Sequence, residues 1–186
     1  NVSIDGQELT YDRRNSRLDP TDGYVVRLSN DIAGLGGDIA YLKNRATSTV
    51  YHGLAEDWVF SVRGEIGYVF GLGDDDVRIT DRCFLGGDKR RGVDDGGLGP
   101  RDVATNDALG GKLVYSGSVE LTFPLGLPKK FGLNGAVFSD AGSLTDLDVN
   151  DPVIEDTASL RWTAGDGLAW RSPFGPVRLD LAMPIV

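Results

Sequence analysis

The sequence has little of what disulfide-stabilised folds and most metal or catalytic sites need. Among its 186 residues it holds one cysteine, Cys83, and one histidine, His52. A single cysteine excludes a disulfide framework and a cysteine-rich zinc site, and a single histidine argues against a His-based metal site or catalytic triad. We therefore expect no cofactor and no metal ion. We expect His52 to be a surface histidine and Cys83 a packed small residue.

Long apolar runs and positive charge are also scarce. No stretch approaches the roughly 18 consecutive apolar residues of a transmembrane helix, which leaves open membrane-spanning strands of about ten residues. The chain has 28 Asp and Glu against 19 Lys and Arg, a net charge of -9, which argues against a nucleic-acid partner. Glycine is abundant, with 26 residues, but three Trp and six Tyr argue against a disordered chain.

Apolar and polar residues alternate along several long segments. The clearest is 58–70, and 112–123 repeats the pattern. A period of two predicts strands, and their length of ten to thirteen residues exceeds the five or six that are usual in soluble sandwiches. Aromatic residues stand at the predicted strand ends, as in the girdle of a membrane barrel. These end residues are Trp58, Phe70, Phe123 and Trp170.

The pattern predicts an all-β fold, an antiparallel up-and-down transmembrane β-barrel. Alternation alone leaves open a soluble sandwich whose polar face is wet, because it cannot say which face meets lipid. About eight strands are expected, and the third is the least regular because Lys43 and Arg45 share a face with Ile39 and Tyr41. The expected strands are 2–13, 23–34, 37–52, 58–71, 112–124, 132–143, 158–171 and 176–185.

Two long insertions interrupt this meander. Residues 144–157 carry five Asp or Glu and are expected to form a solvated outer loop. Residues from about 74 to 111 include eight Gly between Gly86 and Gly111, and a loop of that length is usually functional or disordered. Within it, Asp74–Asp76 lacks the spacing of a calcium loop, and Gly86–Lys89 lacks the strand-to-helix context of a phosphate loop.

Residues 82–93, followed by 97–102, resemble the sixth extracellular loop of BamA-type outer-membrane assembly factors. The signature Val-Arg-Gly-Phe/Tyr of that family is matched by Arg90-Arg91-Gly92-Val93, although Arg90 and Val93 differ from its first and last positions. Three further blocks match in the order of the family, and the resemblance covers most of residues 58–186. These blocks are 117–124, 136–142 and 170–180.

The resemblance implies that residues 1–186 are the C-terminal part of a sixteen-stranded barrel domain without its closing strand, with the loop at about 74–111 folded into the lumen. It also implies a bacterial outer-membrane insertase rather than an enzyme. Its partners would be outer-membrane lipid, unfolded outer-membrane protein clients and accessory assembly lipoproteins. Alternatives are a related two-partner secretion or autotransporter-assembly barrel, an outer-membrane barrel enzyme, or a soluble carbohydrate-binding sandwich.

A candidate site follows from the parity of two strands. Glu120 shares its face with Ser116 and Ser118, and Asp140 also falls on the polar side of its strand. Two lumen carboxylates on successive strands need a cation, and Arg91 can offer both its planar fork. Gly92 would allow a sharp backbone turn beside the wall. The resemblance implies the same loop-lock motif of Arg91, Gly92, Glu120 and Asp140.

Alternation also fixes a register in which eight apolar residues face lipid and four charged residues face the lumen. Asp166 falls on the apolar parity of its strand, so we expect it near an interface or turned inward by a bulge. The residues expected to face lipid are Phe60, Val62, Ile66, Leu113, Val119, Leu121, Leu179 and Leu181. Those expected to face the lumen are Arg63, Glu65, Glu120 and Arg178.

Overall fold

A computed structural model provides the structure of this chain. Within the described residues, no helix is long and apolar enough to cross a membrane. The structure describes residues 4–34, 40–72, 82–83, 91–92, 101–102, 110–128, 131–145, 154–155, 160–172 and 175–185.

Ten strands form within these residues. Eight are long and belong to one sheet, whereas β5 and β8 are two-residue strands that pair with each other. The long strands are β1 (Ile4–Asp12), β2 (Gly23–Ala33), β3 (Tyr41–Ala55), β4 (Trp58–Gly71), β6 (Leu113–Pro124), β7 (Leu133–Thr145), β9 (Arg161–Ser172) and β10 (Gly175–Pro184). The short strands are β5 (Arg101–Asp102) and β8 (Ile154–Glu155).

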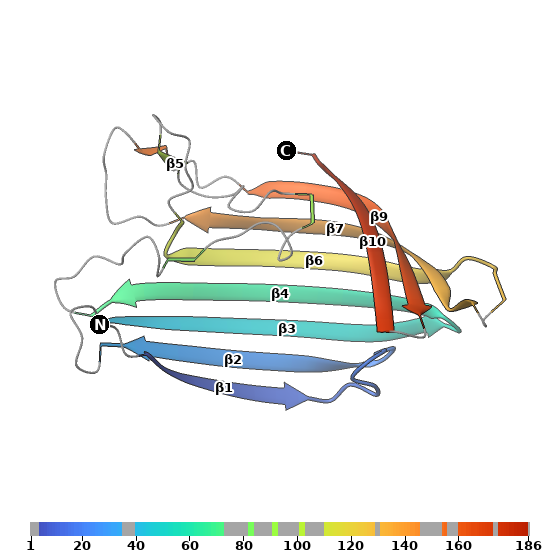
Figure 1. Ribbon diagram of the computed structural model, residues 1–186, viewed down its shortest axis with the longest axis horizontal. Coiled ribbons are helices and arrows are strands. Elements are labelled where there is room, and N and C mark those ends of the chain that lie inside the picture. The colour runs from blue at the N-terminus through green and yellow to red at the C-terminus, as the bar shows by residue number, and fades with distance from the viewer. Residues whose placement is uncertain are drawn as a thin grey trace.

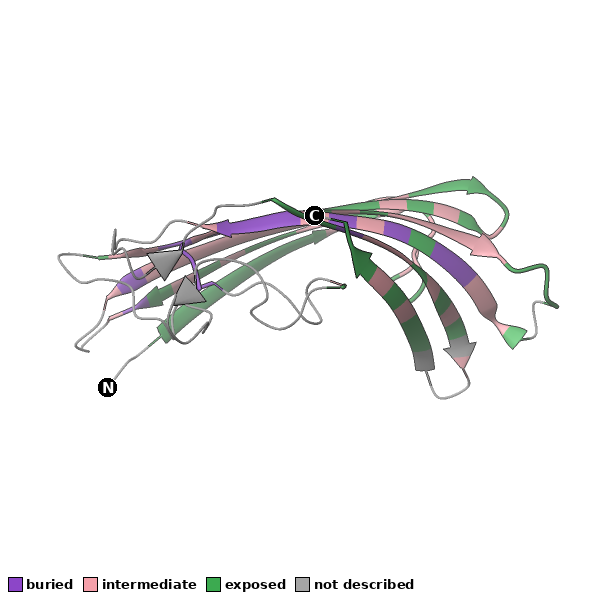
Figure 2. Cartoon of the chain, turned by 90° about the horizontal axis from the view of Figure 1, so that it is seen from above, coloured by how far each residue is buried: buried purple, intermediate pink, exposed green. Residues whose placement is uncertain are grey.

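The large sheet is an antiparallel meander in the order β1-β2-β3-β4-β6-β7-β9-β10, and it is not closed (Figure 1). The connections β2–β3, β4–β6 and β7–β9 leave from one end, which we call the loop end, and the other connections lie at the turn end. The sheet is arched (Figure 2), and Arg91 of the long insertion lies with the concave residues that line a cavity there. The predicted strand count and the up-and-down arrangement are thus confirmed.

The register is confirmed as well. Phe60 pairs with Leu121 and Val62 with Val119, so these apolar residues share the convex face. The four charged residues expected in the lumen all line one cavity on the concave face, and none of the eight apolar residues lines it. Because neighbouring residues of a strand point to opposite faces, one correct position fixes all the others on that strand.

An apolar cluster lies on the concave face near the loop end, where alternation had indicated a polar wall. Val69, Val114 and Leu144 share the parity of Glu65, Glu120 and Asp140, yet each is at most 1% exposed. We call this group the apolar cluster; it consists of Ala33, Tyr41, Val69, Cys83, Val114 and Leu144. Cys83 brings the long loop onto the cluster, since its backbone exchanges two hydrogen bonds with Gly111. As expected, Cys83 is a packed small residue.

The second insertion begins later than expected, and its residues 146–153 and 156–157 lie outside the described residues. Residues 144–157 were expected to be solvated, but β7 continues through Thr145 and Leu144 is fully buried in the apolar cluster. Both insertions also contribute a short strand, and Arg101 pairs with Glu155. Two-residue strands are too short to show an alternation of apolar and polar residues, so alternation could not have predicted them. The start of the third predicted strand, residues 37–39, lies outside the described residues.

The structure contradicts one of the two outcomes expected for Asp166, a bulge that turns it inward. Asp166 lies on the convex face, paired with Val137 and Leu181 in ladders without a register shift, so no bulge turns it inward. The other expected outcome, a place near a membrane interface, stays a prediction. Trp162 and Trp170 lie on the same face, four residues away on each side, or about 13 Å along an extended strand. Asp166 therefore sits midway between two girdle-like aromatics, and β9 is a regular strand nonetheless.

Its neighbours explain why Asp166 does not turn inward. Gly165 and Gly167 occupy the concave face of β9, where an added side chain would meet atoms already present. A methyl group at Gly165 would lie 2.7 Å from the ring of Phe138, and one at Gly167 would collide with the carboxylate of Asp180. A side chain at either glycine would have to displace these atoms, whereas Asp166 between them points to the convex face.

Candidate functional site

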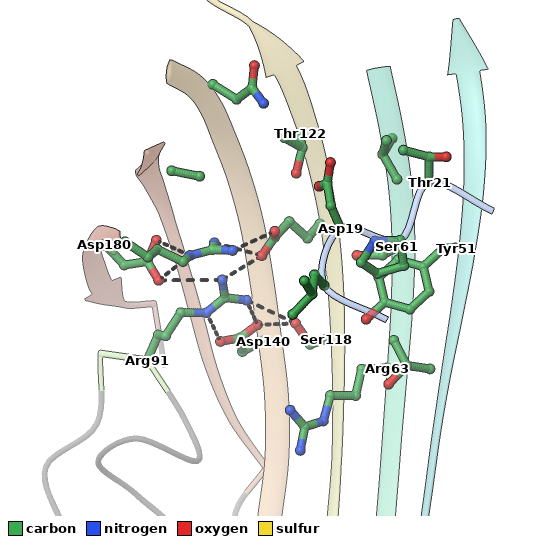
Figure 3. Close-up of a pocket in the computed structure, with 18 of the residues that line it drawn as sticks. Asp19, Thr21, Tyr51, Ser61, Arg63, Arg91, Ser118, Thr122, Asp140 and Asp180 are labelled. Atoms are coloured by element: carbon green, nitrogen blue, oxygen red, sulfur yellow. Dashed lines mark hydrogen bonds and ion pairs between the residues drawn. The ribbon is translucent and has the colours of Figure 1, made fainter. Parts of the chain in front are cut away.

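A cavity of about 690 Å³ occupies the hollow of the concave face. Its lining comes from β3, β4, β6, β7, β9 and β10, from the β1–β2 connection and from Arg91 of the long loop. Figure 3 shows Arg91 entering from the loop toward Ser118, Asp140 and Asp180, while Arg63 points away from that group. Arg91 and Gly92, which we call the loop tip, therefore share the hollow with the charged side chains of the sheet.

Arg91 lies between two strands and bonds to both. Its Nε and Nη2 donate to the two carboxylate oxygens of Asp140 at 3.0 and 2.8 Å. Its Nη1 donates to Oε2 of Glu120 at 2.7 Å, and Nη2 also donates to the hydroxyl of Ser118 at 3.0 Å. The fork is thus bidentate toward Asp140 and spans β6 and β7, an arrangement that lysine cannot reproduce.

A second arginine, which the motif did not include, bonds to the same carboxylate. Arg178 on β10 donates from Nη1 and Nη2 to the two oxygens of Glu120, both at 2.8 Å. Its Nε donates to both oxygens of Asp180 at 2.8 Å, and the Oδ2 of Asp180 lies 3.8 Å from Nη1 of Arg91. Parity placed Arg178 in the lumen, but no sequence signal paired it with Glu120, 58 residues away.

We call Arg91, Glu120, Asp140, Arg178 and Asp180 the charge cluster. It holds two guanidinium groups and three carboxylates, so their attraction offsets most of the repulsion among the carboxylates. Exposure rises from 7% for the Asp140 side chain to 37% for that of Arg178. The ion pairs of Arg91 are therefore the more sheltered from solvent screening.

Arg91 packs closely against β7. The guanidinium carbon of Arg91 stands 3.5 Å from the ring centroid of Phe138, which adds a cation–π contact. Gly92 follows with a φ of 77°, a conformation that glycine adopts without strain. Burial lowers the pKa of the Arg91 guanidinium, but the hydrogen bonds to Asp140 and Glu120 outweigh it, so the pKa lies above its ordinary value. The loop tip therefore keeps its charge.

The other charged groups of the concave face form a looser set. The Arg45 Nη1 lies 3.2 Å from Oε1 of Glu65, but outside hydrogen-bond geometry. The Arg63 guanidinium lies 3.9 Å from Glu65 and its side chain is 60% exposed. Among the described residues, no three acidic, histidine or cysteine side chains gather so as to hold a metal ion. The described lining of the cavity thus offers charged groups and hydrogen-bonding groups.

The four residues of the motif come together in the structure. Arg91 reaches Glu120 and Asp140, and Gly92 lies beside it. The two departures from the family signature, at 90 and 93, fall outside the described residues, as do 74–76 and 86–89. His52 is exposed as expected, with Nδ1 3.6 Å from a carboxylate oxygen of Asp22.

Comparison with known proteins shows which family this chain resembles. A family model described as the Omp85 superfamily domain matches residues 4–186. The chain belongs to the Omp85 superfamily. This finding, together with the matches below, confirms the predicted family and the predicted outer-membrane barrel fold.

Relatives with assembly roles in their names match nearly all of this Omp85 chain. The outer membrane protein assembly factor BamA of Neorickettsia risticii (strain Illinois) is 38% identical over 186 residues, covering 100% of this chain and 25% of that protein. The sorting and assembly machinery component 50 homolog of Homo sapiens is 29% identical over 174 residues, covering 88% of this chain and 37% of that protein. The chain spans about a quarter of the length of its bacterial relatives.

A solved structure shares the fold. The crystal structure of BamA from Haemophilus ducreyi lacking POTRA domains 1–3 matches with a TM-score of 0.85 and 25% identity, covering 97% of this chain and 38% of that chain. Eight strands of the present sheet thus follow the course of a barrel wall in a known member of the superfamily.

Proposed function

We propose that this chain is part of the barrel of an outer-membrane protein assembly factor, which folds and inserts β-barrel proteins into the outer membrane. The observation that carries the proposal is the 38% identity, over the whole chain, to an assembly factor of that name. Residues 1–186 would be the C-terminal part of the barrel domain, and the segment at about 74–111 its lumen-folding loop.

The charge cluster supports a mechanical rather than a chemical role. Arg91 would act as a lock, holding the loop tip against β6 and β7 through Glu120 and Asp140, with Gly92 giving the backbone room. No bond is made or broken in this role, so the protein would not be an enzyme. The partners would be outer-membrane lipid, unfolded outer-membrane protein clients and accessory assembly lipoproteins.

The test uses the full-length protein in lipid vesicles with an unfolded outer-membrane β-barrel protein as the client. The protein should accelerate client folding, read as the gain of protease-resistant, heat-modifiable client, above the rate in empty vesicles. Arg91→Ala should lose most of this acceleration, whereas Arg27→Gln should keep it. Arg27 is a matched control because it lies on the concave face of β2, aligned with Thr47, but does not line the cavity. Client folding no faster than in empty vesicles would refute the proposed function.

A further inference from the structure

The concave face of β9 is nearly bare at its middle. Its residues on this face are Thr163, Gly165, Gly167 and Ala169. A Cβ atom at Gly165 would collide with the Leu181 carbonyl oxygen, because the backbone of β10 folds closely over β9 there. We call Gly165 and Gly167 the glycine crease, since glycines in a strand allow such a bend. Figure 2 shows β9 and β10 curving away from the rest of the sheet toward its concave side.

The bend is what allows Arg178 to meet Glu120. Across the ladders, Glu120 is aligned with Phe138, Gly165 and then Ala182, so Arg178 lies three strands away and four residues further along. On a flat sheet that offset is roughly 14 Å across and 13 Å along, or about 19 Å in all. The observed bidentate bond therefore exists only because β10 is folded over the hollow, where it lies in front of β6 in Figure 1.

The loop tip touches the folded strand directly. A Cβ atom at Gly92 would stand 2.8 Å from the Cβ of Ala182 on β10 and 3.4 Å from Thr163 on β9. Arg91 and Arg178 also share one oxygen, Oε2 of Glu120. The tip and the strand thus meet through backbone packing and through a common carboxylate, two contacts of different physical kind.

We propose that Arg178 and Asp180 are positioning residues for Arg91, and that the loop tip and β10 hold each other in place across the glycine crease. Arg178 orients Glu120 for Arg91, and Gly92 rests on Ala182, so release of either element loosens the other. This coupling does not rest on the proposed function, because it concerns the positions of two segments and not client folding.

Trypsin provides a direct readout on the full-length protein in lipid vesicles. Trypsin binds the arginine side chain in its specificity pocket, so it cuts the Arg91–Gly92 bond only after Arg91 has left Glu120 and Asp140. Arg178→Gln should raise the rate of this cleavage about tenfold, because a charged hydrogen-bond pair that orients Glu120 is lost. Arg178→Lys should give a smaller rise, and Arg27→Gln should cleave at the wild-type rate.

A glycine pair tests the same coupling without removing a charge. Gly167→Ala should also raise cleavage, since its methyl group would displace the Asp180 carboxylate. Gly64→Ala is the matched control, because nothing lies within 4 Å of a Cβ atom at that position. This pair keeps the test open if Arg178→Gln fails to fold.

The reverse direction is read by hydrogen exchange. Arg91→Gln should lower protection of the β10 amides in residues 177–183 more than that of the β2 amides, because β10 loses its contact with the tip. The proposal is overturned if Arg178→Gln and Gly167→Ala cleave within twofold of wild type, or if Arg27→Gln cleaves as fast as Arg178→Gln. Unchanged exchange in β10 after Arg91→Gln would overturn it as well.

Discussion

Two anchors fix the long loop to the concave wall, and they work by different physics. At the loop end, Cys83 completes the apolar cluster, where Val69, Val114 and Leu144 are buried. Further along β6, Arg91 completes the charge cluster at Glu120. Val114 and Glu120 are six residues apart, or about 20 Å along an extended strand. The first anchor gains from removing apolar surface from water, and the second depends on matching charges.

The difference teaches how each anchor should fail. An apolar cluster that loses one side chain keeps its other contacts. The stability lost therefore scales with the volume of the side chain removed. A charge cluster that loses one cation keeps its carboxylates, whose desolvation is then poorly compensated. The charge cluster should therefore be the more sensitive to a single substitution.

The largest effect is expected for Arg91→Ala. Glu120 and Asp140 would lose three charged hydrogen bonds while their side chains stay sheltered, so the full-length barrel should lose about 3–5 kcal/mol of stability. Equilibrium unfolding by urea in lipid vesicles measures this loss, with Arg27→Gln as the control. A loss below about 1 kcal/mol would mean that the cluster is too well solvated to act as an anchor.

The second largest loss of stability is expected for Leu144→Ala. The side chain is 1% exposed in the apolar cluster, and truncating a buried leucine costs about 2–4 kcal/mol. The same unfolding assay applies, together with the rate at which a thiol reagent labels Cys83, which should rise as its packing loosens. Leu18→Ala is the matched control, because Leu18 is 92% exposed and should change stability by less than about 0.5 kcal/mol. Equal losses in the two variants would contradict the buried apolar anchor.

Arg91→Lys should cost less, about 1–2 kcal/mol, because it keeps the charge and loses the fork. It should also add a pH dependence. The raised pKa of Arg91 means that its contribution is complete below the ordinary arginine pKa and is lost only above that value. Wild type should therefore keep the tip bound up to about pH 11, whereas the lysine variant should begin to weaken once the pH rises past about 10.4, the ordinary lysine pKa. Cleavage after residue 91 by a lysine- and arginine-specific protease that is active across this range reports both.

The smallest effect is expected for Arg63→Gln. Arg63 lines the same cavity, but it is mostly exposed and its nearest carboxylate oxygen is 3.9 Å away. Such a pair contributes little, so stability should change by less than about 0.5 kcal/mol in the urea assay. A loss as large as that of Arg91→Ala would show that total charge in the hollow matters more than the geometry of the charge cluster.

Sequence reasoning predicted the sheet and one anchor but not the other. The strand pattern repeats over many residues, so the strands could be predicted from the sequence. Glu120 and Asp140 are polar residues at positions where the alternation expects polar residues, so their place in the lumen could be predicted as well. Val69 and Leu144 share that polar parity, and they are buried in a cluster that includes Cys83 of a distant segment, a tertiary contact that alternation does not encode.

Alternation predicted that Arg178 faces the lumen, but it did not predict the ion pair between Arg178 and Glu120. Its partner Glu120 lies on a strand three positions away in the sheet, and the distance between them depends on the bend at Gly165 and Gly167. Alternation says which way a side chain points, but it carries no information about curvature. Asp166 lies between these two glycines on the convex face, where the regular alternation of β9 places it.

The coupling between Arg91 and Asp140 tests the account most directly. It is measured by a double-mutant cycle of Arg91→Gln and Asp140→Asn, with unfolding of the full-length protein in lipid vesicles as the readout. If the tip is held by these bonds, Asp140→Asn should be costly in wild type and nearly harmless beside Arg91→Gln, with a coupling of at least about 1.5 kcal/mol. Losses that add within about 0.5 kcal/mol would contradict a loop tip held by the charge cluster.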